Sequence, residues 1–182
     1  SIVTAQIGVQ NLGHCIGIHM NMPIAPPDPN NMDNLTDQET DALKSMQFYQ
    51  DNDSGYSKQQ STRPQTLGYG LADSPIGQAA WILEKFYQWM DCNGHPENIA
   101  SRDELLDNVM MYWLPDAGAS SARIYWESFG STNLDSIEIP VGCTLFPKEI
   151  FKTSERWARA RFTNLIHFEV MEKGGHFAAF EQ

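Results

Sequence analysis

The sequence predicts an α/β fold in which a long helical segment is inserted between the strands of one sheet. Short apolar runs of strand length occur near the start of the chain and again after Gly130. Between them, apolar residues recur at the three- and four-residue spacing of helices. The last part of the chain returns to the order strand, helix, strand. This succession of elements is typical of an α/β sheet interrupted by a helical insertion.

The N-terminal part predicts a helix, a strand and then a break in regular structure. Residues 1–10 mix small and apolar residues at helical spacing, and residues 15–22 form a short apolar run of strand length. Residues 23–34 contain four prolines and several Asn and Asp residues, which interrupt regular structure. We therefore expect a new structural unit to begin within this proline-rich segment.

Capping signals mark where the helices of the middle segment begin. Thr36 and Glu39 stand in the S/T-x-x-E order of a capping box and start a helix expected over 36–53. A polar, glycine-rich segment follows it. Ser74 before Pro75 matches an N-cap with proline at the first helical position. Further helices are expected over 76–90, 101–113 and 120–129.

After the helical segment the pattern returns to strands. A strand is expected over 137–146, a helix over 154–162 and a second strand over 165–172. The chain has 182 residues, and 41% of them are hydrophobic, which is enough to bury a core. Three parts follow from these elements: core segments over 1–25 and 131–182, and a helical domain over 26–130.

The charge and composition exclude several classes of function. The net charge is −11 without a Lys/Arg block that could follow a phosphate backbone, so we expect no nucleic-acid partner. No apolar run reaches the roughly 18 residues that cross a bilayer, and no signal-peptide pattern precedes the first helix. We expect a soluble chain with the cytoplasm as its default location, while an upstream membrane anchor stays open. The three cysteines are expected to be reduced thiols.

The segment over 171–182 carries the strongest chemical signal. There a predicted strand runs into Gly174, Gly175 and His176, and the glycines permit a tight loop at the carboxyl edge of the sheet. His176 in such a loop is either a base or a loop histidine without a task, and spacing alone does not separate the two. The other histidines lack a second ligand at metal spacing, and no nucleotide-binding glycine motif is present, so neither a metal nor a cofactor is expected.

The segment Met171 to Gln182 (MEKGGHFAAFEQ) resembles the catalytic-histidine loop of epoxide hydrolases of the α/β-hydrolase superfamily, those related to the microsomal and juvenile-hormone enzymes. The resemblance covers nearly the whole chain and implies the C-terminal part of an α/β-hydrolase fold, with a helical cap over 26–130. Further blocks follow in the family's order: Gly55-Tyr56, Gln60 with Thr62 to Thr66, Leu71 to Gly77, Ala80 to Phe86, and Phe146 to Glu149.

The resemblance implies that the parent protein opens an epoxide to a vicinal diol. In this family an aspartate attacks an epoxide carbon to form an alkyl-enzyme ester, which a histidine-activated water then hydrolyses. His176 matches the general base, and Glu149 matches the carboxylate that orients it. Tyr56 in SGY and Tyr125 in SSARIYWESFG match the two phenols that protonate the epoxide oxygen, although by pattern alone Tyr125 would be a core residue.

The nucleophilic aspartate of the family has no match in this chain. If Ser1 is the serine of the family's Gly-Gly-Asp-x-Gly-Ser turn, the aspartate lies three residues before it. We therefore expect an inactive chain that needs the N-terminal part of the same enzyme, with a small apolar epoxide and water as substrates; a homodimer stays open. Two alternatives also stay open: a catalytically silent hydrolase-fold remnant or interaction module, and an esterase or dehalogenase of the same fold. The preferred substrate and enantiomer do not follow from the sequence.

Overall fold

The structure is a computed structural model that describes residues 2–128, 130 and 133–182. The chain divides into two compact units. The sheet unit contains Ser1–Asp51 and Thr132–Ala178, and the helical unit contains Asn52–Ser131 and Ala179–Gln182. Within the described ranges, no helix is both long and apolar enough to cross a membrane.

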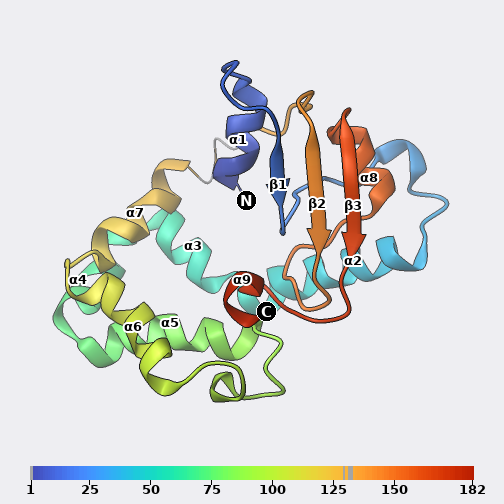
Figure 1. The fold of residues 1–182 in the computed structure, drawn as a ribbon. Coiled ribbons are helices and arrows are strands. Elements are labelled where there is room, and N and C mark those ends of the chain that lie inside the picture. The colour runs from blue at the N-terminus through green and yellow to red at the C-terminus, as the bar shows by residue number, and fades with distance from the viewer. Residues whose placement is uncertain (1, 129, 131–132) are drawn as a thin grey trace. The chain divides into compact units, whose positions relative to one another are not determined.

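The sheet unit is built on three parallel strands in the order β1-β2-β3. They are β1 (Ile18–Met20), β2 (Val141–Leu145) and β3 (Leu165–Val170), so the three strands predicted from the sequence are present (Figure 1). β1 and β2 are shorter than predicted and begin in register with each other, at Ile18 and Val141. Directly before Val141 stands Pro140, which has no N–H to donate to a neighbouring strand.

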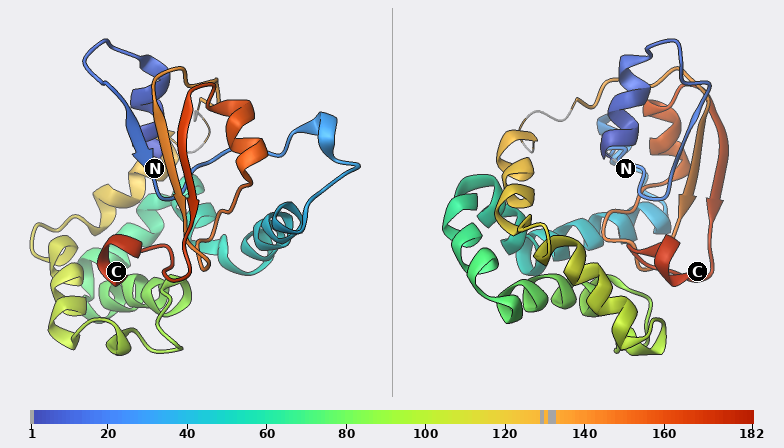
Figure 2. Two further views of the ribbon diagram at one scale, coloured as in Figure 1. Left: turned by 45° about the vertical axis from the view of Figure 1, so that its right-hand side comes forward. Right: turned by 60° about the vertical axis from the view of Figure 1, so that its left-hand side comes forward.

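Two helices, α1 (Ile2–Gln10) and α8 (Glu155–Arg161), lie on the same side of the sheet (Figure 2). Between these helices and the strands lies an apolar core that includes Val141, Cys143 and Trp157, each at most 1% exposed. Gly8 lets α1 approach closely, because a Cβ there would lie 2.8 Å from the Ile18 side chain. Burial of this one face stabilises the unit through the hydrophobic effect.

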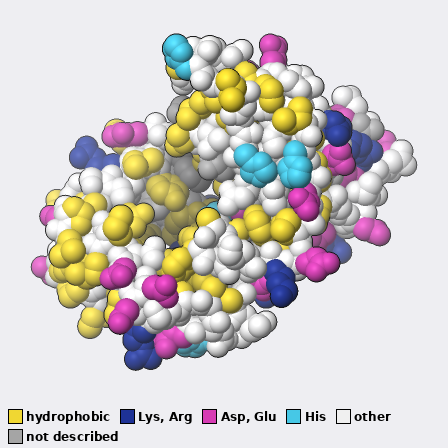
Figure 3. Space-filling model, viewed as in Figure 1, with side chains coloured by type: hydrophobic (Ala, Val, Ile, Leu, Met, Phe, Trp, Pro, Cys, Tyr) yellow, Lys and Arg dark blue, Asp and Glu magenta, His cyan; other side chains and the backbone are white. Residues whose placement is uncertain are grey.

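The opposite face of the sheet carries polar side chains. His19 Nε2 lies 2.9 Å from Thr144 Oγ1, and the rings of His19 and His167 are 5.7 Å apart between centroids. Figure 3 shows two neighbouring histidine side chains, in cyan, on this face. The strands therefore alternate between an apolar face under the helices and a polar, exposed face.

An ion pair between the buried Glu39 and the partly exposed Arg156 connects α2 (Asp37–Phe48) to α8 within the sheet unit. The predicted capping box is present: Glu39 N–H donates to Thr36 Oγ1 at 3.2 Å, and Thr36 N–H donates to Glu39 Oε2 at 2.9 Å. The fully buried Glu39 carboxylate also accepts hydrogen bonds from Ser154 Oγ at 2.7 Å and from Arg156 Nε at 2.9 Å. Arg156 lowers the pKa of Glu39 from 4.5 to about 2.

Among the described residues, the helical unit contains five longer helices, labelled in Figure 1: α3 (Gly55–Thr62), α4 (Pro64–Asp73), α5 (Pro75–Trp89), α6 (Arg102–Trp113) and α7 (Gly118–Ser128). The sequence predicted α5, α6 and α7, although residue 129 of the last prediction lies outside the described residues. The caps of α5 and α6 are the predicted ones, at Ser74 and Ser101. Shorter helical turns lie at Pro29–Asn31, Tyr49–Asp53, Pro96–Asn98 and, as α9, Ala178–Glu181.

The sequence did not predict α3 and α4, where only a polar, glycine-rich segment was expected. Two glycines, Gly68 of α4 and Gly118 of α7, serve a close helix contact rather than a turn. A Cβ at Gly68 of α4 would lie 2.8 Å from the Ala119 Cβ of α7, and one at Gly118 would lie 2.9 Å from the Leu71 Cβ. The backbones of α4 and α7 therefore approach closely without large apolar side chains between them.

Candidate active site

Two loops at the carboxyl ends of β2 and β3 run side by side in the sheet unit. Lys148 N–H donates to the Gly174 carbonyl at 3.1 Å, and Lys148 forms a parallel bridge with Gly175. These main-chain contacts continue the strand pairing beyond the ends of the strands. Because Glu149 and His176 directly follow the two bridged residues, their side chains are brought together.

Gly174 is required by the geometry of the second loop. Its φ is +112°, a conformation that residues with a side chain rarely adopt. A Cβ at this position would also lie 2.6 Å from Phe146 Cδ1. This is the structural reason for a glycine before His176, where the sequence indicated a tight loop.

Glu149 and His176 form a buried hydrogen-bonded pair. His176 Nδ1 lies 2.6 Å from Glu149 Oε1, which also accepts the Ile150 N–H at 2.7 Å. The side chain of Glu149 is 3% exposed and that of His176 is 24% exposed. An ionised carboxylate only accepts hydrogen bonds, so the geometry assigns the proton of a neutral imidazole to Nδ1 and leaves the lone pair on Nε2. The pair can therefore act as a base with an orienting acid.

The second carboxylate oxygen of Glu149 contributes to this directionality. Within the part of the chain that the structure describes, Oε2 is buried and has no hydrogen-bond partner. Both of the hydrogen bonds described for this carboxylate converge on Oε1, the oxygen next to the imidazole. Because Oε1 contacts Nδ1, the ionised carboxylate can stabilise a positive imidazolium.

Tyr56 and Tyr125 contact each other within the helical unit. Their ring centroids are 5.8 Å apart with an angle of 78° between the planes, an edge-to-face contact. Tyr56 lies on α3 and Tyr125 on α7, and both side chains are partly exposed. Two phenols that lie next to each other can both donate hydrogen bonds to one oxygen atom of a ligand.

The sequence reasoning missed Lys85 of α5, which lies next to this tyrosine pair. Its Nζ is 4.8 Å from the ring centroid of Tyr56 and 5.0 Å from that of Trp89. The spacing of Lys85 and Trp89, four residues apart on one helix, was the available signal that they share a face. The contact with Tyr56 of another helix could not be read from that spacing.

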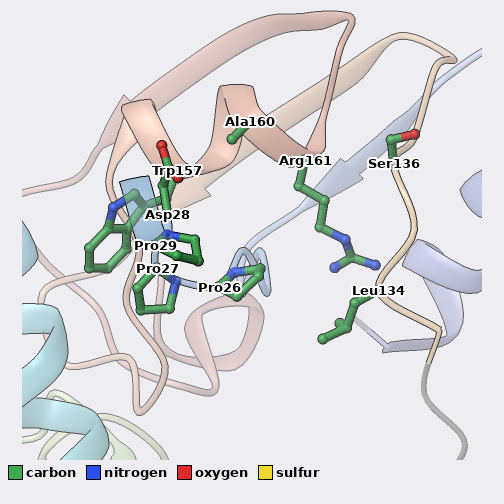
Figure 4. Close-up of a pocket in the computed structure, with 9 residues that line it drawn as sticks. All are labelled: Pro26, Pro27, Asp28, Pro29, Leu134, Ser136, Trp157, Ala160 and Arg161. Carbon is green, nitrogen blue, oxygen red and sulfur yellow. The ribbon is translucent and has the colours of Figure 1, made fainter. Parts of the chain in front are cut away.

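A pocket of about 210 Å³ in the sheet unit lies beside α8 and is lined by the proline-rich residues 26–29, Trp157 and Arg161 (Figure 4). Arg161 is only 4% exposed. Its guanidinium donates to the main-chain carbonyls of Ile24, Asn133 and Asp135. Arg161 therefore connects α8 to the segments that contain these three carbonyls. Since its donors are engaged in this way, we assign the pocket no catalytic role. Among the described side chains, no group of three or more His, Cys, Asp or Glu is placed to hold a metal ion.

The sheet is parallel, with a carboxylate on the loop after β2, a histidine on the loop after β3, and a set of helices inserted in the sequence between β1 and β2. This arrangement defines the class: an α/β-hydrolase fold, as the sequence predicted. The solved structures that resemble the chain are epoxide hydrolases. An enantioselective mutant of the enzyme from Aspergillus niger superposes with a TM-score of 0.84 at 30% identity, over 100% of this chain and 45% of that one. Juvenile hormone epoxide hydrolase from the silkworm Bombyx mori gives a TM-score of 0.76 at 28% identity, over 91% of this chain and 45% of that one.

The proteins that resemble the chain in sequence are also named epoxide hydrolases. The chain is 48% identical over all 182 residues to a putative epoxide hydrolase of Stigmatella aurantiaca and covers 41% of it. It is 39% identical to epoxide hydrolase 1 of Sus scrofa in an alignment that covers 71% of this chain and 31% of that protein. No family model matches the chain. The chain thus spans less than half the length of these relatives and matches their C-terminal part, which confirms the predicted resemblance to epoxide hydrolases.

Proposed function

We propose that this chain is the C-terminal part of an epoxide hydrolase and supplies the general base, its orienting carboxylate and the phenols that protonate the substrate oxygen. The observation that carries the proposal is the 2.6 Å hydrogen bond between His176 Nδ1 and Glu149 Oε1, which leaves Nε2 as the basic atom. The names of the relatives support an epoxide as the substrate, and we propose that this epoxide is small and apolar. In this proposal the cap expected over 26–130 is the helical unit, which begins only at Asn52 because residues 26–51 belong to the sheet unit.

The first half of the proposed reaction needs a nucleophile, which we assign to an aspartate outside this chain. Its carboxylate attacks an epoxide carbon, and the carbon–oxygen bond breaks with its electron pair moving to oxygen. That oxygen takes a proton from Tyr56 or Tyr125, which leaves a hydroxyl group next to an alkyl-enzyme ester. The chain alone would be inactive, since it needs the N-terminal part of the same enzyme.

The second half hydrolyses the ester. His176 Nε2 removes a proton from water while the water oxygen attacks the ester carbonyl carbon, and Glu149 stabilises the imidazolium that results. The ester bond cleaves, the leaving oxygen takes the remaining proton of the attacking water, and the aspartate is released as a carboxylate while the diol leaves. The proton on the imidazolium returns through solvent to the tyrosine, so that epoxide and water become diol and the enzyme is restored.

The test is diol formation from styrene oxide by the full-length protein that carries this chain. His176→Ala should lower the hydrolytic rate by about 1,000-fold or more, and the protein should accumulate the ester, seen as a mass increase equal to one substrate molecule. Tyr56→Phe and Tyr125→Phe together should abolish ring opening, so that no ester forms. His14→Ala, which changes an exposed histidine, is the matched control. Normal turnover in His176→Ala or in the double phenylalanine variant would contradict these roles.

A further inference from the structure

Lys85 holds its ammonium group against aromatic rings rather than in water. Nζ lies over the rings of Tyr56 and Trp89, and only 13% of the lysine side chain is exposed. A lysine on a helix usually extends its charged end into solvent along its methylene stem. Burial of the charge against two rings is favourable because their electron-rich faces attract a cation.

The Tyr56 ring is held in place by neighbours on other helices. It meets the Trp89 ring of α5 at 5.2 Å and 64°, and the Tyr125 ring of α7 at 5.8 Å and 78°. Trp89 is itself fixed, since its indole N–H donates to Asp53 Oδ2 at 3.3 Å and its side chain is buried. The ammonium group and the phenol ring therefore keep a defined geometry.

We propose that Lys85 is a positioning residue for the proton donor Tyr56, whose ring gains negative charge when the phenol gives its proton to the oxygen of the opened epoxide. The inference rests on the function proposed above and adds the group that makes Tyr56 a better donor. In this step the O–H bond of Tyr56 breaks, a new O–H bond forms on the substrate oxygen, and the electron pair stays on the phenolate. A cation 4.8 Å from the ring stabilises the phenolate more than the neutral phenol.

The other charged groups around this cluster are less favourably placed to act on Tyr56. Glu84 Oε1 lies 3.0 Å from the Lys85 ammonium, but the Glu84 side chain is 60% exposed, so water screens its charge. Asp53 is engaged by Trp89. The charged side chains of α3 and of the helices packed against it, α4 and α7, are exposed: Lys58, Asp73, Arg123 and Glu127.

The experiment measures the ionisation of Tyr56 directly in the full-length protein. Tyrosines are replaced by 3-fluorotyrosine, the Tyr56 signal is assigned in the ¹⁹F NMR spectrum by its loss in Tyr56→Phe, and its chemical shift is followed against pH. In Lys85→Met the midpoint of the Tyr56 titration should rise by about one pH unit, that is, about tenfold less phenolate at a given pH. Lys85→Arg should keep the wild-type midpoint. The matched control Lys58→Met removes the same charge from an exposed position on α3 and should have a much smaller effect.

Turnover provides the second readout. In Lys85→Met, kcat for styrene oxide should fall about tenfold with little change in KM, while the alkaline limb of the kcat profile moves to higher pH together with the NMR midpoint. A purely structural role for Lys85 would lower activity without moving this limb. Lys85→Gln repeats both measurements with a polar side chain, in case Lys85→Met folds poorly.

Three results would overturn the inference. The first is a Tyr56 titration midpoint that stays unchanged in both Lys85→Met and Lys85→Gln. The second is a rise of the midpoint in Lys58→Met as large as that in Lys85→Met, and the third is a similar rise in Lys85→Arg. Absence of diol formation by the wild-type full-length protein would instead refute the proposed function. The two failures are distinguishable because the NMR titration needs no turnover.

Discussion

Replacement of Glu39 by glutamine should lower the free energy of unfolding of the sheet unit by about 2 kcal/mol at pH 7. The Glu39 carboxylate is fully buried and accepts hydrogen bonds from three residues, Thr36, Ser154 and Arg156. Glutamine keeps the shape of the side chain. It removes the negative charge and exchanges one acceptor oxygen for an NH₂ group that then faces other donors.

The magnitude follows from the lowered pKa of Glu39. The difference between its ordinary pKa of 4.5 and about 2 in the folded protein corresponds to about 3 kcal/mol at 1.36 kcal/mol for each tenfold change. The Arg156 side chain is 37% exposed, so water screens part of this interaction, and about 2 kcal/mol remains. Because the folded-state pKa is the lower one, this stability is fully present above pH 4.5 and is lost as the pH falls from 4.5 to about 2.

Urea denaturation of the full-length protein, followed by far-UV circular dichroism at pH 7 and pH 3, measures this effect. The matched control is Glu155→Gln, which breaks an exposed ion pair of α8 with Arg159, where the side chains are 48% and 58% exposed. The control should cost less than about 0.5 kcal/mol. The reasoning is refuted if Glu39→Gln costs no more than the control at pH 7, or if its cost is the same at pH 3.

Three further predictions concern the backbone, a thiol and the buried arginine. Gly174→Ala should reduce both stability, by about 1–3 kcal/mol, and diol formation. The control Gly70→Ala, in open space on α4, should reduce neither in the same denaturation and turnover assays, since alanine favours the helix by up to about 1 kcal/mol. Burial raises the pKa of Cys143 to about 12, so iodoacetamide at pH 8 should label Cys15 before Cys143. Mass spectrometry of tryptic peptides measures the labelling of each cysteine, and equal labelling would contradict this. Arg161→Met should cost about 3 kcal/mol in urea denaturation because its carbonyl partners lose their donors, and a cost below about 1 kcal/mol would argue against the connecting role.

Local signals predicted most of the fold. The capping boxes at Thr36 and Ser101 and the Ser74-Pro75 start are contained within a few residues of sequence, and the helices begin where these signals stand. The ends of the strands depend on partners instead. β1 begins at Ile18 because this is the first residue that pairs with β2. No pattern within residues 15–22 indicates where this pairing begins.

Long-range contacts account for what the sequence did not predict. The Glu39–Arg156 ion pair joins residues 117 positions apart, and the glycine contact between α4 and α7 depends on Ala119 of a distant helix. Without these partners a polar, glycine-rich segment resembles a loop. In α3 and α4, tertiary packing therefore outweighs the low helix propensity of the glycines.

The candidate site could be predicted only in part. The pairing of Glu149 with His176 was expected from the resemblance to a family and not from periodicity, because the two residues belong to separate loops. The glycines before His176 were a local signal, and the positive φ of Gly174 gives it a physical basis. Lys85 had no motif of its own, so its contact with Tyr56 emerges only from the packing of α3 against α5.

The main-chain bridge between Lys148 and Gly175 has a consequence for enzyme engineering. Peptide groups hold the two loops in register, so the alignment of Glu149 with His176 depends on main-chain contacts at Lys148, Gly174 and Gly175. Position 150 contributes only its N–H to the Glu149 carboxylate, and every amino acid except proline supplies that group. Substitutions at this position other than proline should therefore leave the hydrogen bond between Glu149 and His176 in place.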